Sequence, residues 1–131
     1  NCFALMEDGD VYAWGYNAHG QLGIGNANNQ NTPQKITTFD KNVKSIQATC
    51  PRYTHVVALT TDNKLYTWGY NGYGVLGHGN TTNLSVPTEI PSITWDNGAS
   101  NPGKIKTTIN PIKTLTPRFI TKALEKSKKS K

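Results

Sequence analysis

The chain has 131 residues, of which 35% are hydrophobic and 17% charged, and its net charge is +6. This length suits one modest domain, and no apolar run approaches the roughly 20 residues of a membrane-spanning helix. Its two cysteines, Cys2 and Cys50, lack the Cys-x-x-Cys spacing of zinc sites and are too few for a disulfide framework, so we expect free thiols.

The positive charge is concentrated at the C-terminal end. Up to Ile90, five Lys and Arg against six Asp and Glu give −1, whereas nine against two after Ile90 give +7. This asymmetry indicates an anionic partner for the C-terminal segment or a solvated tail with no partner. The chain does not begin with Met, which fits a processed or excised piece, and it shows no sorting sequence that would assign a compartment.

The N-terminal residues predict a β-hairpin. Residues 2–6 are apolar, residues 7–10 form a turn, and residues 11–14 alternate aliphatic or small side chains with aromatic ones. Asp8-Gly9 supplies the positive φ of a tight hairpin turn. Residues 55–60 and 64–68 predict a second hairpin, in which Asp62-Asn63 makes the turn because both residue types tolerate the left-handed region.

A glycine-rich run follows each hairpin. Glycines occupy positions 15, 20, 23 and 25, and again 69, 74, 77 and 79. Fixed offsets of this kind predict positive φ or close approach of another backbone. The runs lack the Gly-Lys-Ser/Thr ending and the following helix of a phosphate-binding loop, so nucleotide binding is not expected.

Further strands are predicted after these runs. Residues 27–32 and 81–86 read as polar loops, closed by Pro33 and Pro87, which open short edge strands near residues 34–36 and 88–90. Residues 43–48 alternate apolar and polar side chains and give the unit its fourth strand.

The sequence contains an internal repeat with an offset of 54 residues. Residues 1–36 align on residues 55–90 without a gap and are identical at 16 of 36 positions. Four short strands in a period of about 50 residues indicate one propeller blade. We therefore predict an all-β fold for residues 1–90: a partial β-propeller of about two four-stranded antiparallel blades, with repeat cores 1–36 and 55–90. Because stacked repeats usually need roughly three units, its flanks should be exposed.

Residues 91–131 are predicted to be a linker and an irregular basic extension. Residues 91–103 read as linker, residues 104–109 could add one strand, and Thr116-Pro117 starts a short basic helix. Six cations make this end a candidate for binding phosphates or an acidic partner by counterion release: Arg118, Lys122, Lys126, Lys128, Lys129 and Lys131. Without interleaved aromatic residues, contact with nucleic acid should be non-specific.

The repeat resembles that of the regulator of chromosome condensation family. The resemblance rests on His55-Val56-Val57-Ala58-Leu59-Thr60, Leu65-Tyr66-Thr67-Trp68-Gly69-Tyr70-Asn71 and Gly74-Val75-Leu76-Gly77-His78-Gly79, and on Gly20-Gln21-Leu22-Gly23 in the first copy. It covers residues 1–90. It implies a β-propeller that usually has seven four-stranded blades, of which this chain would supply about two. Members of this family act in nucleotide exchange on a small GTPase with chromatin binding, in ultraviolet-B sensing, in ubiquitin ligases and in enzyme inhibition; their shared property is a propeller that binds proteins.

The resemblance also implies what the chain does not carry over. The photoreceptor's Gly-Trp-Arg-His-Thr element corresponds here to Cys50-Pro51-Arg52-Tyr53-Thr54, which lacks the chromophore Trp and argues against light sensing. The Gly that ends the strand before the hairpin is replaced by Cys50. No residue could be matched to an exchange site.

Aromatic side chains supply the candidate site. Trp14 and Trp68 occupy equivalent positions and are expected to pack blade on blade. Interface hot spots favour Tyr and Arg, so the candidate partner-binding residues are Tyr16, His19, Arg52, Tyr53, Tyr70 and Tyr73, although packing within the loops would explain the tyrosines equally well. His19 and His78 have no partner at metal-ligand spacing, so neither metal nor cofactor is predicted.

We therefore predict a non-enzymatic protein–protein interaction or structural module, since no nucleophile elbow or catalytic motif is present. It would be a scaffold or complex subunit, an incomplete propeller completed by further blades or by a partner chain. Two alternatives stay open: a guanine-nucleotide exchange factor fragment for a small GTPase, and a nucleic-acid-associated subunit of a ribonucleoprotein or chromatin that acts through the basic tail. No membrane partner is expected.

Overall fold

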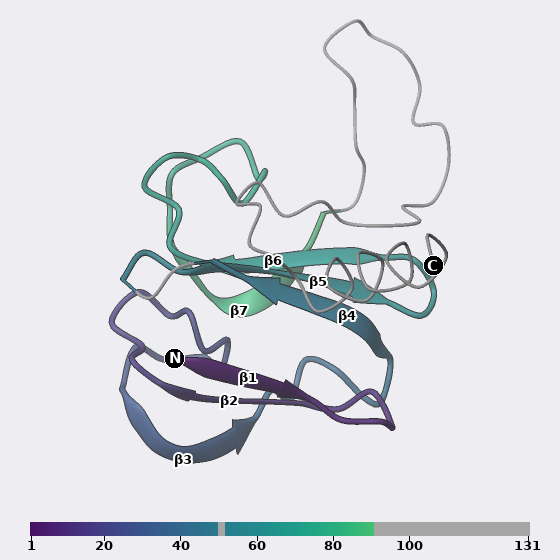
Figure 1. Ribbon diagram of the computed structural model, residues 1–131. Helices are drawn as coiled ribbons and strands as arrows, with labels where there is room; N and C mark the ends of the chain where they lie inside the picture. Colours follow the sequence, from purple (N-terminus) through teal and green to yellow (C-terminus); the bar gives the residue numbers. More distant parts are fainter. Residues whose placement is uncertain (50–51, 91–131) are drawn as a thin grey trace, which may run out of the picture.

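The structure, a computed structural model, describes residues 1–49 and 52–90, which form two antiparallel sheets lying one above the other (Figure 1). The first sheet contains β1 (Cys2–Leu5), β2 (Val11–Gly15) and β3 (Gln30–Lys35), in that order. The second contains β4 (Val43–Ala48), β5 (His55–Thr60), β6 (Leu65–Gly69) and β7 (Leu84–Glu89), also in chain order. The predicted all-β partial propeller is confirmed. Within the described ranges, no helix has the length and apolar character needed to cross a membrane.

Both predicted hairpins are present. β1 pairs with β2 so that Cys2 lies opposite Trp14, and β5 pairs with β6 so that His55 lies opposite Gly69. The turns use the residues that the sequence indicates, with a φ of 92° at Gly9 and 61° at Asn63. The eight repeat glycines also have positive φ, as predicted from their fixed offsets.

The strands that contain proline are longer than predicted. β3 and β7 begin before Pro33 and Pro87, so these prolines lie inside strands and do not open them, and residues 30–32 and 84–86 are strand instead of loop. Both strands are the outer members of their sheets and pair on one side only. Both prolines also fall within irregularities of the pairing with the neighbouring strand, where a missing N–H breaks no ladder hydrogen bond.

The assignment of β4 to the first unit is wrong. Residues 36–42 carry the chain across to the second sheet, where β4 pairs with β5 and Ala48 lies opposite Val56. The described part of the first sheet therefore has three strands, and the second has the predicted four. A counterpart of β4 for β1 would lie 54 residues earlier, before Asn1, so β1 pairs on one side only.

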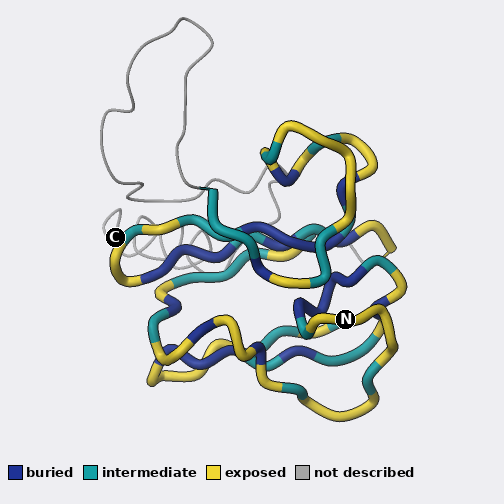
Figure 2. The backbone as a smooth tube through the Cα atoms, turned by 180° about the vertical axis from the view of Figure 1, so that it is seen from behind, coloured by how far each residue is buried: buried dark blue, intermediate teal, exposed yellow. Residues whose placement is uncertain are grey.

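A single apolar core joins the two repeats. The first repeat contributes Val11, Ala13, Leu22 and Ile36, the connection contributes Phe39, and the second sheet contributes Val43, Val56, Ala58 and Trp68. Buried segments run through the strands of both sheets, whereas the connecting loops are largely exposed (Figure 2). The predictions for Cys50 and for residues 91–131, including the extra strand, the short helix and the basic tail, lie outside the described residues.

Candidate protein-interaction site

The loops that carry the candidate residues lie at one end of both sheets. This loop end comprises residues 16–29, 49, 52–54 and 70–83, which follow β2, β4 and β6 (Figure 1). The opposite turn end comprises residues 6–10, 36–42, 61–64 and 89–90. Strands that alternate in direction bring the first three loops together, so residues far apart in sequence share one surface.

The first glycine-rich loop is built around a buried asparagine. Asn17 is fully buried, and its Nδ2 donates to the carbonyl oxygens of Asn26 and Asn28, each at 2.9 Å. Its Oδ1 accepts from the backbone N–H of Leu22 at 2.9 Å, and its own backbone N–H donates to Asn29 Oδ1 at 2.8 Å. The loop is thus closed on its own interior by one side chain.

The second loop repeats this construction around Asn71. Its Nδ2 donates to the carbonyl oxygens of Asn80 and Thr82 at 3.0 and 2.9 Å, and its Oδ1 accepts from the N–H of Leu76 at 3.0 Å. Backbone groups held this way have few alternative partners, so each loop keeps one shape. In each repeat the residue before the asparagine and the second residue after it are candidate partner-binding residues.

Five of the six candidate residues from this part of the chain form one aromatic cluster: Tyr16, His19, Tyr53, Tyr70 and Tyr73. The His19 ring is central, because it stacks on Tyr53 at 5.9 Å between centroids and meets Tyr70 edge-on at 5.1 Å. Tyr70 also lies 4.8 Å from Tyr53 and 6.0 Å from Tyr73. Separations of 4.5–7 Å are typical of interacting aromatic rings.

The aromatic cluster is both packed and accessible. Tyr73 is 83% exposed, Tyr53 51% and Tyr16 40%, whereas His19 and Tyr70 are only partly exposed. Packing within the loops and accessibility to a partner, which the sequence left as alternatives, therefore coexist. Arg52, the sixth residue, is exposed beside Tyr53 and forms no ion pair with any described residue.

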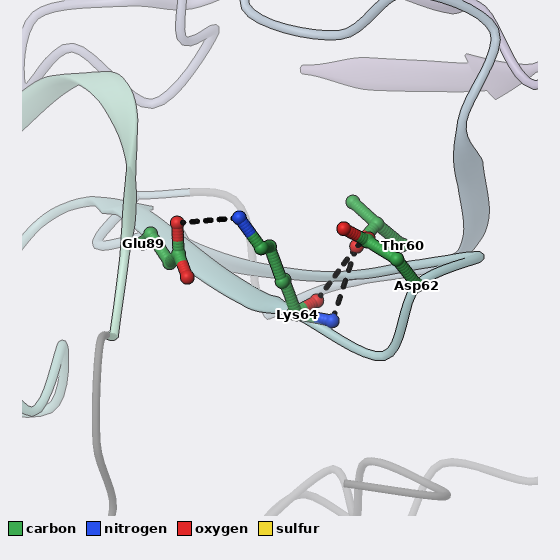
Figure 3. A network of polar contacts seen from close by, with 4 residues as sticks. All are labelled: Thr60, Asp62, Lys64 and Glu89. Atoms are coloured by element: carbon green, nitrogen blue, oxygen red, sulfur yellow. Dashed lines mark hydrogen bonds and ion pairs between the residues drawn. The ribbon is translucent and has the colours of Figure 1, made fainter. Parts of the chain in front are cut away.

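The carboxylates are gathered at the turn end. Glu7, Asp8, Asp10, Asp40, Asp62 and Glu89 all lie there, whereas the described loop end carries one formal charge, on Arg52. Lys35 forms an ion pair with Asp10 at 3.0 Å, and its hydrogen bond lowers the pKa of that carboxyl. The turn of the second repeat has a polar network in which Glu89 contacts Lys64 at 3.5 Å and raises its pKa, while Thr60 bonds Asp62 and the Lys64 backbone (Figure 3).

The junction between the repeats supports the cluster from below. Trp68 is fully buried, as predicted for blade packing, and its Nε1 donates to the carbonyl oxygen of Gln21 at 3.1 Å. Its ring also meets Phe39 at 5.9 Å and Phe3 at 6.4 Å. Because His19 and Gln21 belong to the same loop, the indole fixes the height of that loop against the second blade.

The other histidines have structural partners. Thr67 Oγ1 donates to the Leu76 carbonyl oxygen at 2.7 Å, so His78 Nε2, 2.9 Å from the same oxygen, serves as the donor there. His55 packs beside Thr49, and burial lowers its pKa. Among residues 1–49 and 52–90, no three His, Cys, Asp or Glu side chains converge as a metal site would require.

Sequence reasoning missed the asparagines that shape the site. Asn17 and Asn71 lie in polar, glycine-rich loops, where asparagine usually signals an exposed turn. Their one signal was identity at the same offset in both repeats, together with Asn26 and Asn80, and Asn29 and Asn83. Three asparagines repeated in one frame indicate a network of side-chain contacts with the backbone.

Two antiparallel sheets packed through a repeated indole define consecutive blades of a β-propeller. The family model for the regulator of chromosome condensation (RCC1) repeat matches residues 8–59 and 62–95. The chain therefore belongs to the RCC1 repeat family.

Similar proteins differ widely in their described roles. The chain is 39% identical over 93 residues to the ultraviolet-B receptor UVR8 of Arabidopsis thaliana, covering 70% of this chain and 20% of that protein. It is 43% identical over 77 residues to the probable E3 ubiquitin-protein ligase HERC6 of Homo sapiens, covering 58% and 7%. The crystal structure of human WBSCR16 superposes with a TM-score of 0.56 at 26% identity, covering 69% and 23%. The chain thus spans about a quarter or less of each of these proteins.

Proposed function

We propose that this chain is a non-enzymatic protein-interaction module in which the aromatic cluster of the loop end contacts a protein partner. The observation that carries the proposal is the convergence of Tyr16, His19, Tyr53, Tyr70 and Tyr73 from three separate loops onto one accessible surface. Tyrosine is enriched among the residues that dominate binding energy at protein interfaces.

The construction of the loops supports this proposal. Binding costs free energy when flexible side chains and loops must be ordered, at about 0.5–1.5 kcal/mol per immobilised side chain. Asn17 and Asn71 already hold the loop backbones, and mutual ring contacts already restrict His19 and Tyr70. The exposed rings of Tyr53 and Tyr73 then offer apolar area and hydroxyl groups at low entropic cost.

The proposal includes completion of the propeller by further blades or by a partner chain. β1 pairs on one side only, and the two described sheets pack on each other but enclose no ring. Residues 1–90 would then be the two-blade unit, and residues 91–131 the linker and basic extension.

An affinity-capture comparison tests the interaction site. The tagged chain, a Tyr53→Ala/Tyr73→Ala variant and a control variant, Glu7→Ala/Lys41→Ala at the turn end, are compared by quantitative mass spectrometry of the captured proteins. We expect at least one specifically captured protein to fall about tenfold or more with the aromatic variant and to stay unchanged with the control. Equal capture by all three chains, or equal loss with both variants, would contradict the proposal.

Two other functions remain predictions from the sequence. Guanine-nucleotide exchange on a small GTPase follows from the family resemblance, and no described residue favours it over general partner binding. Association with nucleic acid depends on the basic tail, which lies outside the described residues.

A further inference from the structure

The packing of the second repeat on the first defines two complementary faces. The indole face belongs to the second repeat and consists of Trp68 and Ser85. The glycine face belongs to the first repeat and consists of Gly20, Gln21 and Gly23. A Cβ added to Gly23 would lie 2.7 Å from Trp68 Nε1, and one added to Gly20 would lie 2.6 Å from the Ser85 Cα, so the two faces touch without space for a side chain.

Hydrogen bonds fix the register of these faces. Trp68 Nε1 donates to the Gln21 carbonyl oxygen at 3.1 Å, and the Gly25 N–H donates to the Ser85 carbonyl oxygen at 2.8 Å. Burial is complete at the centre, where Trp68 and Gln21 are both 0% exposed. The contact therefore combines an apolar centre with backbone hydrogen bonds, as interfaces between separate chains do.

The counterparts of both faces are present on the outer flanks of the chain. The repeat offset makes Trp14 and Asn31 the indole face of the first repeat, and Trp14 is partly exposed whereas Trp68 is buried. It makes Gly74, Val75 and Gly77 the glycine face of the second repeat, where Val75 is 45% exposed although its counterpart Gln21 is buried. A Cβ added to Gly74 would meet nothing described closer than 3.7 Å.

We propose that a second copy of this chain occupies these flanks, with Trp14 of one copy seated on the glycine face of the next. The inference rests on the part of the proposed function that leaves the propeller incomplete. It names the occupant because both halves of a contact that already forms within the chain recur on its outer flanks. Trp14 Nε1 would donate to the Val75 carbonyl oxygen of the other copy, as Trp68 does to Gln21.

The glycine face of the second repeat has the shape that this contact needs. Asn71 holds its loop with the same set of hydrogen bonds that Asn17 makes in the first, and Leu76, like Leu22, is fully buried beneath the loop. The exchange of Gln21 for Val75 makes the free face more apolar than the occupied one. Burying Val75 and the rest of Trp14 would remove apolar area from water, which favours association.

This contact joins two different surfaces, so it is head-to-tail. Such a contact closes into a ring when the rotation between copies divides a full turn, and otherwise continues as a chain. Propellers hold about four to eight blades, so closed rings of two-blade units would contain about two to four copies.

Sedimentation velocity of the full 131-residue chain across a wide concentration range tests the proposal. Two variants block one face each without touching the core: Asn31→Arg on the indole face and Val75→Arg on the glycine face, both at exposed positions. We expect the unsubstituted chain to gain mass with concentration and each variant alone to stay monomeric. An equimolar mixture of the two variants should form a two-chain complex, because each supplies the face that the other lacks.

Circular dichroism of each variant establishes that the fold is retained. A Tyr53→Ala variant should self-associate like the unsubstituted chain while losing the captured partner, which separates this inference from the proposed interaction site. The inference is overturned if the unsubstituted chain stays monomeric at its solubility limit, if either variant alone associates normally, or if the mixture fails to associate.

Discussion

Asn17 and Asn71 are the residues on which the shape of the loop end depends. Replacing Asn71 by Ala would leave the Asn80 and Thr82 carbonyl oxygens and the Leu76 N–H without their partner. Each unsatisfied buried group costs about 1–3 kcal/mol, so we expect Asn71→Ala to lower the free energy of unfolding by about 3 kcal/mol. Urea denaturation measures this, with the exposed Asn31→Ala as a control that should stay within about 0.5 kcal/mol. A similar loss in both variants would contradict the role of Asn71.

The two repeat tryptophans should differ in their contribution to stability. Trp68→Phe removes the hydrogen bond to the Gln21 carbonyl oxygen and part of a fully buried ring, at a cost of about 2 kcal/mol. Trp14→Phe at the outer flank should cost about 0.5 kcal/mol, because the ring is already partly exposed. Thermal or urea unfolding at low protein concentration compares them. Equal costs would mean that the inner junction is no better packed than the flank.

His55 should make stability depend on pH. Burial lowers the pKa of its imidazole below 6.5, so the folded chain holds it neutral where the unfolded chain begins to bind a proton. As the pH falls below about 6.5, the unfolded state gains protons first, and the free energy of unfolding should fall until the pH passes the folded pKa. Urea midpoints between about pH 7.5 and 5 measure this. The His55→Gln variant should lose most of the slope, and an unchanged slope in that variant would assign the effect to another group.

Residue types at fixed offsets carried most of the correct predictions. Asp8-Gly9 and Asp62-Asn63 marked both hairpin turns, and the repeat glycines marked positive φ. The pairing of His19 with Tyr53 and Tyr70 could not be predicted, because it depends on how far one blade is rotated against the next. Sequence places these residues on loops, and only the packing of Trp68 brings the loops together.

At the scale of whole elements, the glycine-rich loop acts as the seat for the next blade. Gly23 and Gly25 both have positive φ, 72° and 86°, so replacing either by Ala carries a similar backbone cost of about 1–2 kcal/mol. Only Gly23→Ala also places a methyl group against the Trp68 indole, since a Cβ added at Gly25 meets nothing within 4 Å. We expect Gly23→Ala to be less stable than Gly25→Ala by about 1–3 kcal/mol in urea denaturation. Equal stability would show that this loop is not the seat.

The strand errors share one physical cause. Pro33 and Pro87 suggested that polar loops end where strands begin, but an outer strand needs hydrogen bonds on one side only and can contain a proline. β4 alternates as predicted, yet alternation says which face is buried and not which sheet a strand joins. Its membership in the second sheet follows from the crossover at residues 36–42, which a local pattern does not reveal.

At the scale of the whole molecule, charge is separated along the chain. Within the described ranges the carboxylates lie at the turn end and the aromatic cluster at the other, while most cations fall after Ile90. If the tail binds phosphates, deleting residues 116–131 should abolish binding to single-stranded RNA, and Lys35→Ala/Lys41→Ala should leave it unchanged. Six contacts would give a salt dependence with a slope of about −4 in log K against log salt concentration. Binding that survives the deletion, or that ignores salt, would reject a role for the tail.

The central claim is that the two repeats are consecutive blades joined by Trp68 in the glycine-rich loop of the first. Nuclear Overhauser contacts of the Trp68 indole N–H, assigned with the Trp68→Phe variant and recorded on dilute protein, test it most directly. We predict contacts from this proton to Gly23 and from the indole ring to Phe39, which lie 45 and 29 residues away in sequence. An indole that contacts only residues of the second repeat, or that exchanges rapidly with solvent, would contradict the account.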